Sequence, residues 1–194
     1  SGPALLSGKA AGVFFHEIFG HRIEGQRMKS EDDSQTFKKK IGEQVLPPAL
    51  SVYCDPLMKA FEGQDLHGFY RYDDQGAQAR RVNVVEHGIL KSFLMSRTPI
   101  QGFPESNGHG RAQYGFQPAA RQSDLTIASS QAHTREDLRA EVIALAKAQN
   151  KLYAYFFDEV VGGFTQTGRF SPNAFNVTPT LVYRIYTDGR ADEV

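Results

Sequence analysis

Residues 12–25 read GVFFHEIFGHRIEG, which places two histidines and a glutamate inside an apolar run. Between residues 10 and 23 the apolar side chains would point in all directions at 100° per residue, so the run predicts a helix that is apolar on every side. Such a helix has to be buried, with the other elements packed around it. Gly25 is a typical residue to end it.

The histidine spacing in this run is unusual for a metal-binding helix. In the zinc-protease pattern, histidines four residues apart are offset by about 40°, so both imidazoles reach one ion. His16 and His21 are five residues apart, which would leave their side chains about 140° apart on a regular helix. A metal site therefore requires a π-bulge or a break near His21, and Gly20 tolerates such a distortion.

Two interpretations of these ionisable groups remain open. In the first, the histidines are structural and hydrogen-bond to neighbours, as buried polar groups usually do. In the second, one divalent cation satisfies His16, Glu17 and His21 together and removes the cost of burying them unpaired. Zinc suits two neutral imidazoles, and Glu17 would take the proton of a water that attacks a carbonyl. The reaction class would then be amide hydrolysis.

The composition excludes several classes of protein. The 194 residues are 40% hydrophobic and contain 22 basic and 22 acidic side chains, which is typical of a soluble globular chain without a field that attracts nucleic acid. Cys54 is the single cysteine, so an intrachain disulfide and a four-cysteine zinc site are excluded. The sequence predicts neither a signal peptide nor a membrane span, because its N-terminus lacks a charged and apolar leader pattern and its apolar runs are short.

The remaining sequence predicts one α+β domain with a largely antiparallel sheet around the buried helix. Strands are expected in residues 3–8 and 49–56, in a hairpin over 80–96 that turns at Gly88, and in 151–160 and 173–189. A surface helix is expected from about 135 to 149, because Thr134 and Asp137 form a capping pair before an apolar stripe. Residues 103–124 form a long loop, and the charged residues 26–44 predict a mobile flap over the histidine site.

The motif resembles the HExxxH segment of the TldD/PmbA family of metallopeptidases, which are also called modulators of DNA gyrase. The stretches VNVVEHGILKSFLMS (82–96), SNGHGR (106–111) and TPTLVYRIYTDGR (178–190) are similar to that family as well. The resemblance spans residues 8 to 190 and points to the TldD branch, which keeps the motif.

The resemblance implies that His16 and His21 bind zinc and that Glu17 is the general base. It also implies an unfolded peptide substrate in a narrow channel, a cytoplasmic enzyme, and a homodimer or a heterodimer with a family member. The family's third zinc ligand is a cysteine near the C-terminus, and we expect it outside the chain, which ends at Val194. We therefore expect a fragment that lacks the N-terminal domain and the C-terminal end, binds zinc weakly alone and cleaves poorly.

Five further residues have candidate roles. Cys54 is a poor substitute for the missing ligand, because it ends a strand far from the family's ligand position. Glu24, three residues after His21, is expected to orient a histidine rather than to bind the metal. His109 could line the substrate channel or belong to a set of glycine turns. Arg111 and Arg121 could bind a substrate carboxylate or carbonyl, although arginines without function are commoner.

Two rival functions remain. In the first, the chain is a non-catalytic peptide-binding or assembly subunit with structural histidines. In the second, it regulates DNA topology directly, but the basic patch that phosphate binding requires is absent from the sequence. Neither a nucleic acid nor a membrane is therefore an expected partner.

Overall fold

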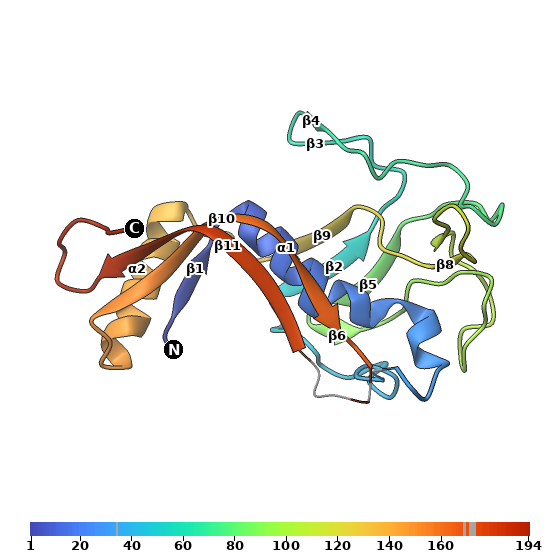
Figure 1. The fold of residues 1–194 in the computed structure, drawn as a ribbon, viewed down its shortest axis with the longest axis horizontal. Helices are drawn as coiled ribbons and strands as arrows, with labels where there is room; N and C mark the ends of the chain where they lie inside the picture. Colours follow the sequence, from blue (N-terminus) through green and yellow to red (C-terminus); the bar gives the residue numbers. More distant parts are fainter. Residues whose placement is uncertain (34, 169, 171–173) are drawn as a thin grey trace. The chain divides into compact units, whose positions relative to one another are not determined.

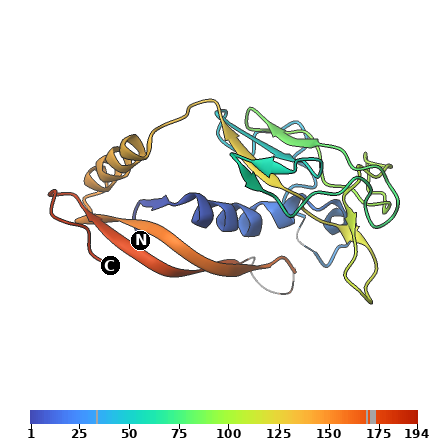
Figure 2. The same cartoon turned by 90° about the horizontal axis from the view of Figure 1, so that it is seen from above.

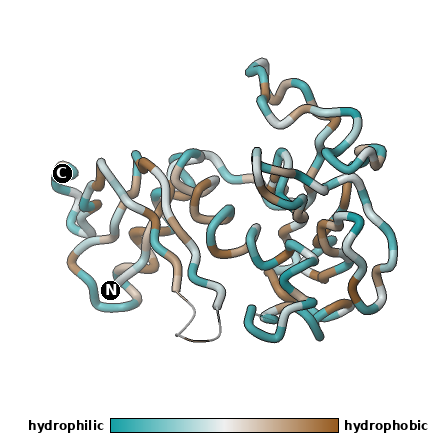
Figure 3. The backbone as a smooth tube through the Cα atoms, turned by 45° about the vertical axis from the view of Figure 1, so that its right-hand side comes forward, coloured by the Kyte–Doolittle hydropathy of each residue, from teal (hydrophilic) through white to brown (hydrophobic). Residues whose placement is uncertain are grey.

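The computed structural model describes residues 1–33, 35–168, 170 and 174–194 (Figure 1). The chain divides into two compact units. The first comprises Ser1–Ile18, Gln131–Thr165 and Phe175–Val194, and the second comprises Phe19–Ser130 and Gln166–Ala174. Both units contain hydrophobic stretches along the chain (Figure 3). The mixture of helices with largely antiparallel sheets confirms the expected α+β class, whereas the expected single domain stays a prediction.

The first unit is built on a three-stranded sheet with the order β1-β10-β11. Its strands are β1 (Ala4–Leu6), β10 (Tyr153–Gln166) and β11 (Ala174–Tyr186). Strand β1 is parallel to β10, and the long strands β10 and β11 run side by side in opposite directions (Figures 1 and 2). Strand β10 is longer than the expected 151–160, because it continues through the glycines that follow.

Helix α2 (Arg135–Ala148) packs on this sheet and confirms the expected surface helix. The Thr134 hydroxyl accepts a hydrogen bond from the backbone N–H of Asp137, and the Asp137 carboxylate accepts one from the backbone N–H of Thr134. This capping box satisfies two donors that the first turn would otherwise leave unpaired. The buried face of α2 and the two long strands form a small hydrophobic core. Its residues are Val142, Ala146, Ala154, Phe156 and Ile185.

The second unit contains an antiparallel four-stranded sheet with the order β6-β5-β2-β9. Its strands are β2 (Leu50–Cys54), β5 (Val82–Glu86), β6 (Ile89–Leu90) and β9 (Leu125–Ser129). Two short hairpins complete the unit, β3 (Ala60–Phe61) with β4 (Gln64–Asp65), and β7 (Gly110–Arg111) with β8 (Ala119–Ala120).

The β5–β6 turn lies where the sequence predicted it, whereas the second strand is shorter than the predicted 80–96 hairpin implies, because β6 ends at Leu90. His87 has a φ of 48° and Gly88 a φ of 80°, and two successive positive φ values are typical of the tight turn whose twist matches that of the strands. His87 is exposed at the tip, as a solvated turn residue should be.

The motif segment is helical only in its first part. Helix α1 spans Gly8–Ile18, and two short 3₁₀ turns follow, η1 (Gly20–Ile23) and η2 (Gly25–Met28). The predicted distortion near Gly20 is therefore present as a break. Burial differs from the expectation, because Ala10 and Glu17 are the buried residues of α1, whereas most residues from 19 to 25 are buried.

The segment expected to form a flap is irregular where the structure describes it beyond η2. Two contacts tie it to other parts of the second unit, to which it belongs. The ring of Phe37 lies 5.3 Å from that of Phe19, and the N–H of Gly42 donates to the carbonyl of Leu90 at 2.8 Å. Among the described residues, no helix is long and apolar enough to cross a membrane.

Candidate metal centre

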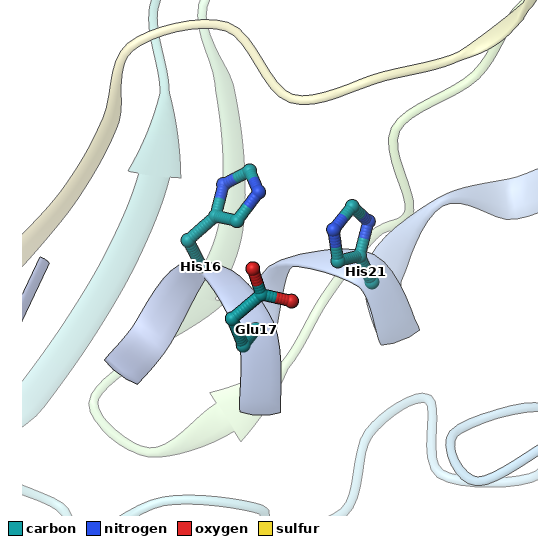
Figure 4. A group of neighbouring side chains, drawn as sticks. All are labelled: His16, Glu17 and His21. Atoms are coloured by element: carbon teal, nitrogen blue, oxygen red, sulfur yellow. The ribbon is translucent and has the colours of Figure 1, made fainter. Parts of the chain in front are cut away.

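The break after α1 brings the three motif side chains together. His16 and Glu17 lie in the last turn of α1, and His21 lies in η1. One ligand atom from each of these residues lies within 4.8 Å of the other two (Figure 4). Ligands on a tetrahedral zinc ion would be about 3.4 Å apart, which lies within this 4.8 Å limit. Within the described ranges, no other group of three such residues meets that criterion.

Gly20 has a different role from the one expected. Its φ is not positive, so the backbone there does not require glycine for its conformation. The space favours it, because a Cβ at this position would lie 1.9 Å from Oε1 of Gln122, and that side chain would have to turn aside. Any larger residue would push the Gln122 side chain or η1 aside, and η1 carries His21.

Glu17 is held by the edge of the long hairpin in the first unit. Glu17 is 6% exposed, and the Thr165 hydroxyl contacts both its backbone carbonyl oxygen at 2.5 Å and its Oε2 at 2.8 Å. Gly163 permits this approach, because a Cβ there would lie 3.1 Å from Cγ of Glu17 and 2.2 Å from the carbonyl of Asn176. The carboxylate therefore has a fixed direction. The sequence indicated only a glycine-rich stretch here, and Thr165 was not foreseen.

His21 contacts the buried carboxylate of Glu24, the residue expected to orient a histidine. Its Nδ1 lies 3.0 Å from Oε1 of Glu24, which is fully buried. Arg27 donates to Oε2 of Glu24 at 2.8 Å, and Arg121 donates to the same oxygen at 3.0 Å. Burial alone would raise the pKa of Glu24, but the hydrogen bond from His21 and the charge of Arg27 lower it overall. Glu24 is therefore ionised, so Nδ1 of His21 is the donor and Nε2 is left for a metal.

A family model described as the PmbA/TldA metallopeptidase C-terminal domain matches residues 1–178 of the chain. The chain belongs to this family. The match confirms the resemblance found in the sequence. The matched residues include the histidine cluster.

Several curated relatives of this PmbA/TldA chain carry protease names. A metalloprotease of Methanocaldococcus jannaschii is 35% identical over 124 residues, which are 63% of this chain and 26% of that protein. A zinc metalloprotease TldD homolog of Saccharolobus solfataricus is 30% identical over 113 residues, which are 57% of this chain and 24% of that protein. The chain thus spans about a quarter of the length of these relatives.

Solved structures of the PmbA/TldA type share the fold. TldE from Thermococcus kodakarensis matches with a TM-score of 0.68 at 21% identity, over 95% of this chain and 38% of that chain. A putative modulator of a DNA gyrase from Thermotoga maritima matches with a TM-score of 0.65 at 21% identity, with the same coverage. At this identity the likeness concerns the fold alone.

The two candidate arginines already bind carboxylates of the PmbA/TldA chain itself. Arg121 is bound to Glu24, and Nε of Arg111 donates to Asp74 at 3.0 Å while its guanidinium lies over the ring of Tyr70. Each therefore has a structural partner, and binding a substrate remains a prediction for both. Cys54 is fully buried in β2, where burial raises the pKa of its thiol to about 12 and disfavours the thiolate that a metal would need.

His109 lies in the interior rather than along an open channel. It is fully buried, its Nδ1 lies 3.2 Å from the carbonyl of Asn107, and its Nε2 lies 3.1 Å from the hydroxyl of Ser123. This placement agrees with the alternative of a glycine-turn residue. Burial lowers the pKa of His109 to about 4, so the imidazole is neutral in the folded chain at neutral pH.

The buried imidazole predicts a loss of stability in acid. The unfolded chain takes up a proton at His109 near pH 6.5, whereas the folded chain does so only near pH 4. Stability is therefore lost as the pH falls through this window, and the free energy of unfolding should decrease by about 3 kcal/mol between pH 7.5 and 4 from this group. Urea denaturation of the wild type and His109→Gln at both pH values measures the difference.

The matched control for this experiment is His87→Gln, because His87 is exposed at the β5–β6 turn. It should show the same pH dependence as the wild type, whereas His109→Gln should lose less stability in acid. Equal acid sensitivity of wild type and His109→Gln would reject the contribution of the buried imidazole.

Proposed function

We propose that the chain carries the catalytic segment of a zinc-dependent peptidase that hydrolyses unfolded peptides. The observation that carries this proposal is the convergence of His16, Glu17 and His21 at the break after α1. Two imidazoles are ligands that suit zinc, and a carboxylate beside them can act as a general base on water. The name of the Saccharolobus solfataricus relative supports the choice of metal.

In this proposal His16 and His21 hold the metal, with Nε2 of His21 directed by the hydrogen bond from Nδ1 to Glu24. When bound, zinc supplies a Lewis acid that polarises the amide carbonyl and makes water more acidic. Glu17 takes the proton of the attacking water and later returns it to the leaving amine. The Thr165 hydroxyl holds Glu17 in place for both transfers.

The third protein ligand in this proposal is a cysteine outside the chain. The proposal further includes a cytoplasmic location, an unfolded peptide as substrate, and a dimer with a second copy or with a family member. Balanced charge, with 22 basic and 22 acidic residues, supports a protein substrate rather than a nucleic acid. The rival is a non-catalytic assembly subunit, and it would retain the fold without binding metal.

Metal analysis of the complete polypeptide tests this proposal. After dialysis, the wild type should retain about one zinc per chain, whereas His16→Ala and His21→Ala should each retain less than about a tenth of that, because each removes one of the three protein ligands that a catalytic zinc requires. Peptide hydrolysis should be lost in parallel and should be absent from the wild type treated with a chelator until zinc is restored.

His133→Ala is the matched control, since His133 is an exposed histidine whose Nδ1 lies 3.0 Å from a carboxylate oxygen of Glu141. It should keep both zinc and activity. If His16→Ala and His21→Ala retain zinc and cleave normally, the metal site is elsewhere and the proposal fails. If the wild type binds no zinc and does not cleave, the assembly-subunit alternative holds.

A further inference from the structure

A cavity of about 730 Å³ lies in the second unit, outside the histidine cluster. Its volume is within the range of about 300–1,000 Å³ that is typical of ligand sites. Its deepest lining residues are Met28 and Phe93, which are 3% and 2% exposed. Phe103 lines the cavity beside them, with its ring 5.4 Å from that of Phe93 in an edge-to-face contact. This part of the lining is therefore apolar, and two of its three side chains are aromatic.

The wall that carries Phe103 is a tight turn. The N–H of Ile100 donates to the carbonyl of Phe103 at 3.1 Å, and the N–H of Phe103 donates back to Ile100 at 3.0 Å. Gly102 supplies the positive φ of 82° that this turn requires. The hydrogen-bonded turn fixes the position of Phe103, so this side of the cavity is formed before any ligand binds.

The charges around the cavity have one sign. Lys29 and Lys38 line it, and no acidic residue does. Neither lysine lies within ion-pair distance of a carboxylate in the part of the chain that the structure describes, whereas Lys40 in the same segment is paired with Glu43. Two unpaired ammonium groups beside an apolar surface favour a ligand that has one negative group and one apolar group.

The cavity is connected to the histidine segment through the backbone. Met28 ends η2, which begins directly after Glu24. The N–H of Gly25 donates to the carbonyl of Leu94 at 2.8 Å, and the N–H of Leu94 donates to the carbonyl of Ile23 at 2.9 Å. Leu94 is therefore hydrogen-bonded to the residues before and after Glu24. Its neighbour in the sequence, Phe93, lines the cavity.

We propose that this cavity binds the carboxy-terminal end of a peptide. The apolar side chain of the last residue packs on Met28, Phe93 and Phe103, and the terminal carboxylate lies between the ammonium groups of Lys29 and Lys38. A carboxylate fits better than a phosphate, because the lining offers two lysines and a broad apolar surface but no arginine fork. The role of this peptide as substrate rests on the proposed peptidase function, whereas its binding does not.

The test measures binding and does not depend on hydrolysis. The probe is a fluorescent six-residue peptide of glycine and serine that ends in phenylalanine, made with a free carboxylate and with a carboxamide. Its affinity for the complete polypeptide in the Glu17→Gln background is measured by anisotropy. We expect the free acid to bind about five- to tenfold more tightly than the amide, as two partly exposed ion pairs would give. The double variant Lys29→Met, Lys38→Met should reduce this ratio to about one.

A charge-matched control is Lys39→Met, Lys91→Met, since both lysines are exposed and neither lines the cavity. It should keep the preference for the free acid. The proposal is overturned if the Glu17→Gln protein shows no preference, if the preference survives the loss of Lys29 and Lys38, or if inorganic phosphate competes as well as the peptide does. If the Glu17→Gln protein prefers the acid while the protein with Glu17 intact cleaves no peptide, the proposed peptidase is rejected but this site is not.

Discussion

Glu17→Gln should lower kcat for hydrolysis of an unfolded peptide by about 10²- to 10⁴-fold, the range that a positioned general base contributes. The carboxamide has the size of the carboxylate and can still accept the hydrogen bond from Thr165, so the local structure should be kept. It cannot take a proton from water. Zinc content should therefore equal that of the wild type, and the defect should appear in kcat rather than in KM.

The matched control is Glu105→Gln, which removes the same charge from an exposed side chain. Its rate should equal that of the wild type. Measuring zinc content and the rate on the same preparations separates a lost base from a lost metal. Unchanged cleavage by Glu17→Gln would show that another group accepts the proton, and loss of zinc in this variant would mean that Glu17 is a ligand.

The parts of the fold that depend on local chemistry could be predicted from the sequence. The capping pair of Thr134 and Asp137 places the start of α2 within one residue, because capping is satisfied within a single turn. The turn at His87 and Gly88 was equally local. The break after Ile18 was also foreseen, because a five-residue spacing cannot converge on a regular helix.

The contacts between residues that lie far apart in the sequence could not be predicted. Gln122 packs closely against Gly20, and those residues are about a hundred positions apart. Thr165 reaches Glu17 from the far end of the chain. Arg121 was considered for substrate binding, yet it neutralises Glu24. Sequence patterns report the period and ends of an element, whereas such pairs depend on which elements the whole fold brings together.

The largest effect on stability is expected at Glu24. Glu24→Ala should lower the free energy of unfolding by about 3–5 kcal/mol, because Arg27 and Arg121 lose the buried carboxylate with which they pair. The side chain of Arg27 is 18% exposed and loses its main acceptor, whereas that of Arg121 is 49% exposed and can turn to water. Chemical denaturation at neutral pH measures the change.

The same substitution should also weaken metal binding, since His21 loses the acceptor that orients its ring. The expected decrease in zinc affinity is about 10- to 100-fold, as is usual for a group that orients a metal-binding histidine. Glu43→Ala is the matched control, because Glu43 forms an exposed pair with Lys40 at the same i,i+3 spacing. That control should cost at most about 1 kcal/mol and leave zinc unchanged. If Glu24→Ala behaves like Glu43→Ala in both measurements, the buried carboxylate neither stabilises the second unit nor directs His21.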